Sequence, residues 1–276
     1  MKIKKLSDKL IKQIAAGEVV ARPVNALKEL IENAIDAKST SIKIFIKDNG
    51  LSEITVWDNG SGIDEEDLKE CIKLHTTSKT AEDDQIFGQN FLGFRGEALS
   101  SIESVSDLII ESNNKKLAKN EITYSNISNG TKVSIFNLFA QVPARLKFIS
   151  SSKVEMFHIK TLLKKFIVKF DNINWLILNN NKELFNFDNN KNQEERIKTL
   201  FETEKIAFFE KNVKDLRISG YLFKTSKSNI IDYVFANNRI IVSKEIKSYL
   251  RSVFKEFCMI NNETNYSYIL FIETDP

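Results

Sequence analysis

Cysteine and histidine are nearly absent from this 276-residue sequence, which narrows the chemistry that it can carry. Cys71 and Cys258 lie far apart and outside any metal-binding spacing, and His75 and His158 are the only histidines. Such a set cannot form a cysteine- or histidine-rich metal site, and it is typical of a reducing compartment. We therefore expect a cytoplasmic protein without structural disulfides.

Long hydrophobic runs are also missing. No apolar stretch approaches the roughly 18 residues of a membrane-spanning helix. The N-terminal residues Met1–Leu6 are basic, but no apolar core follows them, so no signal peptide is expected. Hydrophobic residues make up 42% of the chain and charged residues 28%, which predicts a soluble globular protein of one large domain or two.

Glycine and proline are scarce, at 9 and 3 residues, so turns must also be marked by Asn, Asp and Ser. The net charge of +3 is too small to indicate a nucleic-acid partner by itself. Residues 205–276 hold 11 Lys/Arg and 8 Asp/Glu, whereas the charges of the first 204 residues balance. Any excess of positive charge therefore lies in the last quarter of the chain.

The periodicity of apolar residues predicts an α/β (α+β) protein in two parts. The polar segment 188–195 separates them. Asp64 is expected to cap a short helix, and 76–96 to be a long loop. The other helices are predicted at 22–37, 97–104, 152–169, 194–202 and 244–257, and the strands at 41–46, 54–57, 106–112, 121–127, 131–137, 173–187 (two), 206–211, 214–223, 230–237 and 267–273.

Three polar residues, Glu29, Asn33 and Asp36, share one stripe of the helix predicted at 22–37. A carboxylate and an amide one turn apart can orient a water molecule and hold a hard cation through oxygen atoms. A solvated helix face has the same spacing and remains an alternative.

A second motif, Asp58-Asn59-Gly60-Ser61-Gly62, follows a predicted strand. Its carboxylate can accept a hydrogen bond from a ligand amino group, while the glycines allow the backbone to come close. A simple turn between a hairpin and a helix is the alternative.

Two further motifs follow. Leu92-Gly93-Phe94-Arg95-Gly96 directly precedes a predicted helix, whose first amides could bind an anion. Arg95 could instead form an ion pair that holds the fold, and no Gly-Lys-Ser/Thr follows, so this is not a P-loop. Gly130-Thr131 begins a strand and could place a hydroxyl beside a ligand.

In this order and at these separations, the four motifs resemble the ATP-binding motifs of the GHKL superfamily, which includes gyrase-type topoisomerases, Hsp90, histidine kinases and MutL. Longer strings resemble the MutL mismatch-repair family in particular. They are Gln13 to Val20 with Arg22-Pro23, His75 to Lys79 with Thr76 in place of Ala, Gly93 to Leu99, and Val142 to Phe148.

The resemblance implies a GHKL-type two-layer α/β sandwich with a mixed sheet over residues 1–203. A partial ribosomal-S5-like α/β domain is expected over 204–276. It also implies ATP and Mg²⁺ as ligands, with Glu29 as general base and Asn33 as the Mg²⁺ ligand. Asp58 is expected to recognise the adenine amino group, Gly62 to make room for the nucleotide, and Thr131 to lie near the adenine. Lys79 and residues Leu92, Gly93, Phe94, Arg95 and Gly96 are expected to form a lid over the phosphates.

The resemblance further implies a slow ATPase that acts in DNA mismatch repair as a nucleotide-gated clamp, in which Ile3 to Val20 become ordered. Its expected partners are a second copy, a MutS-type mismatch-recognition protein, a downstream nuclease or helicase, and double- and single-stranded DNA. In a bacterial cell it would be associated with the nucleoid. Lys244, Lys247, Arg251 and Lys255 form one basic helical stripe, which we expect to contact DNA phosphates unless it is only a solvated face.

Two departures from the family qualify this interpretation. Asn238 stands where the family has a turn glycine, in Asn237-Asn238-Arg239. The sequence ends at Asp275-Pro276, before a family lysine that reaches the γ-phosphate. The alternative function is therefore a hydrolysis-deficient module that binds nucleotide and DNA. A histidine kinase is disfavoured because no dimerisation helix with a phospho-acceptor histidine is found, and a gyrase because that family's strings are missing.

Overall fold

The structure is a computed structural model that describes residues 7–74, 76, 91–93, 96–225, 230–260 and 266–274, without the side chains of 8–12, 255 and 257–260. It divides into two compact units, each described here by itself. The first comprises Met1–Leu163 with Asn172–Asn189, and the second Lys164–Asp171 with Asn190–Pro276. These compact units place 190–203 with the later part of the chain, and the domain boundary after residue 203 stays a prediction.

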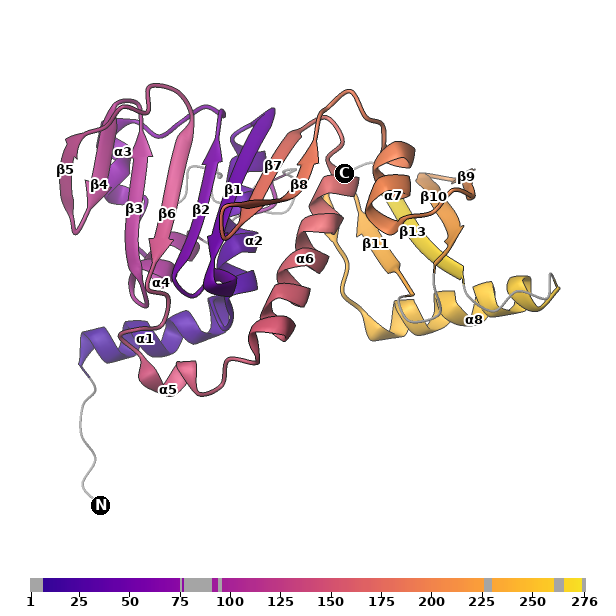
Figure 1. The fold of residues 1–276 in the computed structure, drawn as a ribbon, viewed down its shortest axis with the longest axis horizontal. Helices are drawn as coiled ribbons and strands as arrows, with labels where there is room; N and C mark the ends of the chain where they lie inside the picture. Colours follow the sequence, from indigo (N-terminus) through magenta and orange to yellow (C-terminus); the bar gives the residue numbers. More distant parts are fainter. Residues whose placement is uncertain are drawn as a thin grey trace, which may run out of the picture. The chain divides into compact units, whose positions relative to one another are not determined.

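The first unit is built on an eight-stranded mixed sheet in the order β5-β4-β3-β6-β2-β1-β7-β8 (Figure 1). Only β1 and β7 pair in parallel among the paired strands of this sheet that the structure describes, and the other pairs are antiparallel. The strands are β1 (Ser41–Lys47), β2 (Glu53–Asp58), β3 (Asp107–Ser112), β4 (Lys115–Ala118), β5 (Glu121–Tyr124), β6 (Thr131–Phe136), β7 (Asn174–Asn179) and β8 (Lys182–Phe187).

One face of this sheet is buried because the side chains of a strand alternate between its two faces. Ile42, Ile44 and Ile46 of β1 are fully buried, whereas the residues between them are partly exposed. The register puts Ile42 opposite Asp58 on β2 and opposite Trp175 on β7. Asp58 therefore points to the same buried face as the apolar core.

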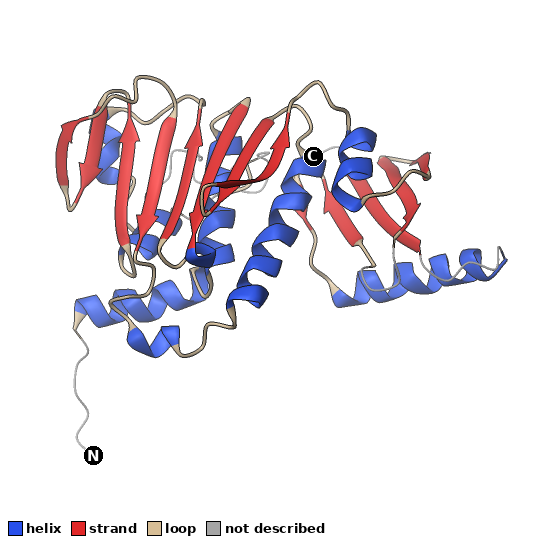
Figure 2. Cartoon of the chain, in the orientation of Figure 1, coloured by secondary structure: helices blue, strands red, loops and turns tan. Residues whose placement is uncertain are grey.

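Helices cover that face (Figures 1 and 2). Helix α2 (Pro23–Asp36) contacts β2, α3 (Glu65–Glu70) contacts β4, and α4 (Ala98–Glu103) contacts β3, α2 and α1 (Asp8–Val19). Helix α2 begins at Pro23, which is tolerated in a first turn. Leu27, Leu30, Ile31 and Ala34 are buried, as the helical spacing predicted, whereas Ile35 of the same predicted set is only partly buried.

Some elements were not predicted. Four are too short to show a clear period: α5 (Pro143–Leu146), the 3-10 turn η1 (Asp48–Gly50), strand β4 and the two-residue β12 (Arg239–Ile240). The 12-residue helix α1 was also missed. Asp64 is the N-cap residue of α3, as predicted, but its side chain does not cap the helix. No side-chain cap hydrogen bond forms there, and the Asp64 carboxylate accepts a hydrogen bond from Asn113 Nδ2 at 3.1 Å instead.

Turns in this glycine-poor chain use other residues in the left-handed region. Among the residues that the structure describes, fourteen non-glycine residues have positive φ, and eight of them are asparagines. Two neighbouring pairs are Asn113–Asn114 and Asn180–Asn181. Asn237 of the Asn-Asn-Arg turn has φ 49°, and asparagine adopts this region more readily than most side chains.

The second unit contains a five-stranded sheet in the order β12-β11-β13-β10-β9, in which β11 and β13 are parallel. Val234, Tyr268 and Leu270 form its buried centre, and Leu250 and Phe254 of α8 pack against them. The elements are α7 (Gln193–Phe201), β9 (Ile206–Val213), β10 (Leu216–Lys224), β11 (Asp232–Ala236), α8 (Lys244–Ile260), β13 (Tyr266–Thr274) and the last turns of α6 (Ser152–Lys169).

A fully buried arginine holds this unit together locally. Arg196 of α7 donates to the carbonyl oxygens of Lys191, Ile167, Phe170 and Asp171, at 2.7 to 3.2 Å. These carbonyls lie at the end of α6 and before α7, so the guanidinium satisfies backbone acceptors that a helix end leaves open. Sequence periodicity gave no indication of this role.

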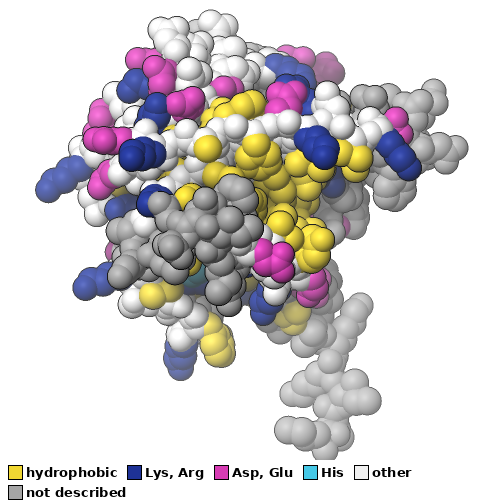
Figure 3. All heavy atoms as spheres, turned by 90° about the vertical axis from the view of Figure 1, so that its right-hand side faces the viewer, with side chains coloured by type: hydrophobic (Ala, Val, Ile, Leu, Met, Phe, Trp, Pro, Cys, Tyr) yellow, Lys and Arg dark blue, Asp and Glu magenta, His cyan; other side chains and the backbone are white. Residues whose placement is uncertain are grey.

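Apolar side chains also reach the surface. Figure 3 shows one face of the molecule on which hydrophobic side chains gather, with basic and acidic side chains around them. In the second unit the large exposed hydrophobic residues include Phe208, Val242 and Tyr249. Across the described residues, none of the helices has the length and apolar character that crossing a bilayer requires.

Candidate functional site

The polar stripe of α2 lies on the side opposite its buried leucines. Glu29, Asn33 and Asp36 are each partly exposed. Glu29 and Asp36 are seven residues apart, which is about 10 Å along a helix axis. The three side chains therefore line about two turns of one helix, and a ligand along this stripe would meet them in sequence.

A lysine of α2, Lys28, contacts two carboxylates of the same helix. Lys28 Nζ lies 2.7 Å from Glu32 Oε2 and 3.3 Å from Glu29 Oε1. Glu32 is 8% exposed, and burial raises its pKa although Lys28 acts against the shift. Burial lowers the pKa of Lys28, but the carboxylates of Glu32 and Glu29 outweigh that effect, so the net shift is upward. Lys28 therefore stays cationic beside Glu29.

Asp58 ends β2 in a buried position and is 6% exposed. Its Oδ1 accepts hydrogen bonds from Ser39 Oγ at 3.0 Å and from the Gly60 amide at 2.8 Å. Burial raises the pKa of Asp58, and backbone hydrogen bonds from Gly60 and Thr131, with the Ser39 hydroxyl, oppose the shift. A carboxyl held in this way is oriented to recognise a hydrogen-bond donor.

Two glycines make close approaches beside Asp58 that no other residue could make. Gly130, with φ 73°, lies so close that an added Cβ would collide with the Asp58 carbonyl oxygen. At Gly62, with φ 78°, a Cβ would come within 2.9 Å of Asn113 Oδ1 and 3.0 Å of Ser112 Oγ. The predicted role of Gly62, to make room for a nucleotide, stays a prediction.

Ser112 links these segments and was missed by the sequence analysis. Its hydroxyl donates to the Gly130 carbonyl at 2.7 Å and accepts from the Ile63 amide at 2.8 Å. It also lies 3.4 Å from Thr131 Oγ1, and both hydroxyl-bearing residues are buried. The signal that could have found it is strand alternation, because Ile110 and Ser112 point to the same side of β3.

Residues 91–93 are attached to the end of α2. The Leu92 amide donates to Asp36 Oδ1 at 2.9 Å, and the Gly93 amide donates to Asp36 Oδ2 at 3.1 Å. Asp36 was predicted to share a cation-binding stripe, whereas here its carboxylate holds the third motif. Gly96 lies against the Thr76 backbone, where an added Cβ would collide. Lys79, Phe94 and Arg95, predicted for the lid, lie outside the described residues.

Two of the MutL-like sequence segments, residues 13–23 and 142–148, contact each other in the first unit. Arg145 donates to the carbonyl oxygens of Gln13 and Val20 and lies over the Phe139 ring. Arg22 Nη2 pairs with Glu155 Oε1 at 2.7 Å, and the Glu155 side chain is 1% exposed. Arg145 therefore connects α1 and the residue after it to α5, and Arg22 connects the start of α2 to the first turn of α6.

The structure thus brings together the end of α2, the end of β2, residues 58–62, Gly130–Thr131 and residues 91–93. A magnesium ion fits this set only in part. Asn33 offers an oxygen ligand, and no group of three or more His, Cys, Asp or Glu that could hold a metal occurs within the described ranges. Magnesium bound to a nucleotide takes few protein ligands and several phosphate oxygens or waters, so such a sparse donor set suits it.

Comparison with known families supports a nucleotide-binding fold. A family model described as histidine kinase-, DNA gyrase B-, and HSP90-like ATPase matches residues 21–157. DNA mismatch repair protein MutL of Persephonella marina is 36% identical over 289 residues, which covers 100% of this chain and 54% of that protein. MutL of Coxiella burnetii (strain CbuG_Q212) is 34% identical over 298 residues, covering 100% and 51%. The chain spans about half the length of these curated relatives.

Solved structures agree on the fold. The crystal structure of the N-terminal domain of a DNA repair protein has a TM-score of 0.79 at 23% identity, covering 96% of this chain and 87% of that one. The Aquifex aeolicus MutL ATPase domain complexed with ADP has a TM-score of 0.67 at 24% identity, covering 93% of each. At these identities the likeness concerns the fold alone, and it confirms the predicted mixed α/β architecture.

Proposed function

Because this chain belongs to the MutL family of the GHKL ATPase superfamily, we propose that it binds ATP with Mg²⁺ and hydrolyses it slowly as the ATP-binding part of a mismatch-repair protein. The observation that carries the proposal is the buried Asp58 carboxyl, held by Ser39 and Gly60 beside Gly62, Gly130 and Thr131. A buried, oriented carboxyl beside backbone that tolerates no Cβ is suited to a planar ligand with an amino group.

At the adenine end, Asp58 accepts a hydrogen bond from the amino group of the base. Gly62 leaves room for the ring, and the Thr131 hydroxyl, 3.4 Å from Ser112 Oγ, lies near the adenine. Discrimination against guanine follows, because a carboxylate acceptor that faces a carbonyl oxygen is left unpaired.

At the phosphate end, Glu29 orients the attacking water and takes its proton, and Asn33 supplies an oxygen to Mg²⁺. When bound, Mg²⁺ neutralises the phosphate oxygens. Lys79 and residues Leu92, Gly93, Phe94, Arg95 and Gly96 cover the phosphates. The cationic Lys28 Nζ lies 3.3 Å from Glu29 Oε1 and adds a positive charge beside the proposed base.

The proposed working cycle is that of a nucleotide-gated clamp, in which ATP favours association of two copies and ordering of the N-terminal segment. Its partners are a MutS-type protein, a downstream nuclease or helicase, and double- or single-stranded DNA, in the cytoplasm of a bacterial cell beside the nucleoid. The hydrolysis-deficient alternative is not favoured by the relatives, which match the ATPase domain as a whole.

DNA contact is proposed for the basic stripe on α8. Lys247 and Arg251 both pair with Asp232, at 2.9 and 2.6 Å, and the side chain of Lys255 is not described. Reversing the charge of all four stripe residues should weaken DNA binding and reduce its dependence on salt. Each lost phosphate contact should lower the slope of log binding constant against log salt concentration by about 0.9. An unchanged affinity and slope would remove this part of the proposal.

Steady-state ATP hydrolysis with Mg²⁺ tests the central claim. The parent chain is compared with Glu29→Gln, which keeps the shape of the side chain but cannot take a proton, and with Glu66→Gln on the exposed α3 as a matched control. Glu29→Gln should bind ATP and lose most turnover, roughly 10²-fold or more for a general base. Equal turnover in all three proteins would show that Glu29 is not the base.

A further inference from the structure

Hydrogen bonds alone hold the carboxyl of Asp58 among the residues that the structure describes. The Ser39 hydroxyl donates to Oδ1 at 3.0 Å and the Gly60 amide at 2.8 Å, and the Thr131 amide donates as well. Burial raises the pKa of Asp58, and these three donors act against the shift. No charged side chain of the described residues is among its causes, so the facing groups are a hydroxyl and two amides.

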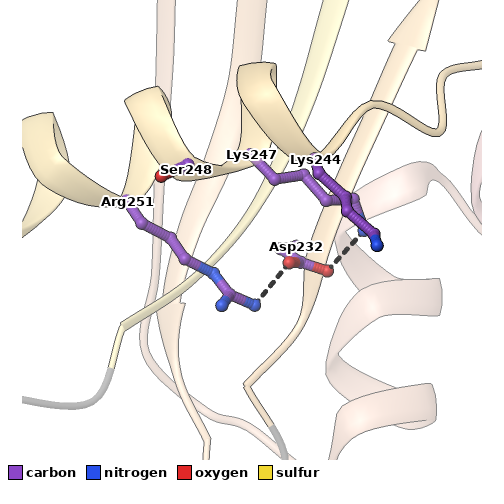
Figure 4. Close-up of a pocket in the computed structure, with 5 residues that line it drawn as sticks. All are labelled: Asp232, Lys244, Lys247, Ser248 and Arg251. Carbon is purple, nitrogen blue, oxygen red and sulfur yellow. Dashed lines mark hydrogen bonds and ion pairs between the residues drawn. The ribbon is translucent and has the colours of Figure 1, made fainter.

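Asp232 of β11 shows the other way in which this chain holds a carboxylate (Figure 4). It pairs with Lys247 Nζ at 2.9 Å and with Arg251 Nη2 at 2.6 Å. Two cations favour the charged form through their charge as well as through hydrogen bonds. Asp58 relies on hydrogen bonds alone, so the loss of any one donor should change its ionisation.

The end of α2 places the Ser39 hydroxyl. Lys38 has φ 62°, and its amide donates to the Ile35 carbonyl at 2.9 Å. The Ser39 amide donates to the Ala34 carbonyl at 3.3 Å. This pair of bonds is a Schellman motif, which ends many helices. Because the bonds use only the backbone, they hold the 4% exposed Ser39 in place whatever its side chain is.

Residues 58–61 pack directly against this turn. The Ser61 amide donates to the Ala37 carbonyl at 3.0 Å. A Cβ on Gly60 would lie 2.6 Å from the same carbonyl oxygen and 2.7 Å from Ser39 Oγ. The hydroxyl therefore has little room to turn away from the carboxyl, and α2, which carries the proposed general base, is connected to the adenine end of the proposed site.

The ionisation of Asp58 decides which base it can bind. A carboxylate has about four acceptor positions and no donor. Ser39, Gly60 and Thr131 fill three of these positions, so one remains for the amino group of adenine. A protonated carboxyl has a hydrogen to donate, which suits the carbonyl oxygen of guanine instead. A donor that favours the anion therefore also favours adenine.

We propose that Ser39 is a positioning residue that makes this site prefer adenine over guanine. Its hydroxyl fixes Oδ1 of Asp58, favours the anionic carboxyl and leaves a single acceptor position for the base. The inference rests on the proposed function, because Asp58 meets the base there. Base selectivity then depends on a side chain just after α2, outside the four ATP-binding motifs.

Calorimetric titration of the 276-residue chain with ADP and GDP, in the presence of Mg²⁺, tests the selectivity without turnover. Ser39→Ala should bind ADP roughly tenfold more weakly and GDP with a much smaller loss, because the charged carboxyl loses a hydrogen bond. Ser134→Ala is the matched control. Ser134 is also 4% exposed, but its hydroxyl bonds to Thr55 Oγ1 at 3.0 Å, and its loss should leave the ADP to GDP ratio unchanged. An equal loss of ADP and GDP binding in Ser39→Ala overturns the proposal.

The ADP to GDP affinity ratio from about pH 5 to 8 gives a reading that a merely structural role would not move. Both nucleotides carry the same phosphates, whose ionisation cancels in the ratio. The ADP preference should be lost as the pH falls through the pKa of Asp58, and in Ser39→Ala this loss should begin at a higher pH. With Asp58→Asn the ratio should not depend on pH, and adding Ser39→Ala should change it less than about twofold. Overlapping profiles of the parent and Ser39→Ala overturn the proposal.

Carbon-13 NMR titration of the Asp58 carboxyl in the nucleotide-free chain separates the two possible failures. The midpoint should lie at a higher pH in Ser39→Ala than in the parent, and Ser134→Ala should match the parent. ADP binding with an unchanged midpoint and ratio in Ser39→Ala refutes the role of Ser39 alone. A raised midpoint in a chain that binds neither nucleotide refutes the proposed function, and base selectivity with it.

Discussion

The carboxylate of Asp36 accepts hydrogen bonds from the amides of both Leu92 and Gly93, at 2.9 and 3.1 Å. This pair of bonds fixes residues 91–93 to the last turn of α2, the helix that carries Glu29 and Asn33. The proposed base and the start of the proposed lid are therefore mechanically connected through one side chain.

Replacing Asp36 by Ala should release this connection. Hydrogen bonds to a charged group contribute about 1.5–3 kcal/mol each, so the Leu92 and Gly93 amides should exchange with solvent at least tenfold faster. ATP affinity should fall with them. Amide hydrogen exchange followed by mass spectrometry or NMR measures the effect, and Asp67→Ala on the exposed α3 is the control. Unchanged exchange at residues 92 and 93 would mean that other contacts hold the segment.

Asp58→Asn should weaken ATP binding and reduce selectivity for adenine over guanine. The amide keeps the volume and can still accept from Ser39 or Gly60, but it loses the charge that favours an amino donor. A loss of about 1–3 kcal/mol in binding free energy is expected, with a smaller loss for GTP. Calorimetric titration of both nucleotides checks this, and an equal loss for the two contradicts adenine recognition by Asp58.

The Arg22–Glu155 pair should be a strong local contributor to stability. Glu155 is 1% exposed, so Arg22→Met leaves a buried carboxylate without its cation and should cost about 3 kcal/mol of unfolding free energy. The double variant with Glu155→Gln should recover part of this loss. Urea unfolding of the single and double variants measures the coupling.

The exposed ion pair of Lys198 and Glu194 provides a comparison for the Arg22 and Glu155 variants. Lys198 and Glu194 are 42% and 43% exposed and lie one helical turn apart, so breaking them should cost less than about 0.5 kcal/mol. If both pairs behave alike, the burial of Glu155 has no energetic consequence.

Lys165 should make stability depend on pH. Its pKa in the folded chain is about 8, against an ordinary value of 10.5. Because the folded-state pKa is depressed, the neutral amine contributes stability fully above pH 10.5, and this contribution is lost as the pH falls through 8. Lys165→Met should therefore stabilise the chain more at pH 7 than at pH 10, by up to about 3 kcal/mol.

Urea unfolding of parent and variant at the two pH values measures that difference. The exposed Lys160→Met serves as the control and should show no such dependence. If the difference in unfolding free energy between the parent and Lys165→Met is the same at both pH values, the lysine keeps its ordinary pKa in the folded chain.

Sequence patterns predicted most of the larger elements, with α1 as an exception, because each predicted element buries one face. The leucines and isoleucines of α2 and the alternating isoleucines of β1 show periods that reveal the core side directly. The family and the mixed α/β fold are confirmed by the comparisons. The individual site roles stay predictions, although Asp58, Gly62 and Thr131 lie in one connected region.

What the sequence could not show are contacts between distant polar residues. Asp36 had the spacing of a cation ligand, yet it binds two amides from a segment 56 and 57 residues away. Ser112 and Arg196 carry no motif, and their roles depend on which carbonyls and amides the fold places around them. The ion pairs of Asp232 with the basic stripe are of the same kind.

The many left-handed asparagines bear on how this chain survives as a folded protein. A left-handed conformation costs a typical side chain about 1–2 kcal/mol relative to glycine, and asparagine somewhat less. Asn114, Asn120 and Asn181 are therefore places where an exchange for glycine should increase the free energy of unfolding. These residues lie in different turns between strands, so exchanges at separate turns should contribute independently to the free energy of unfolding.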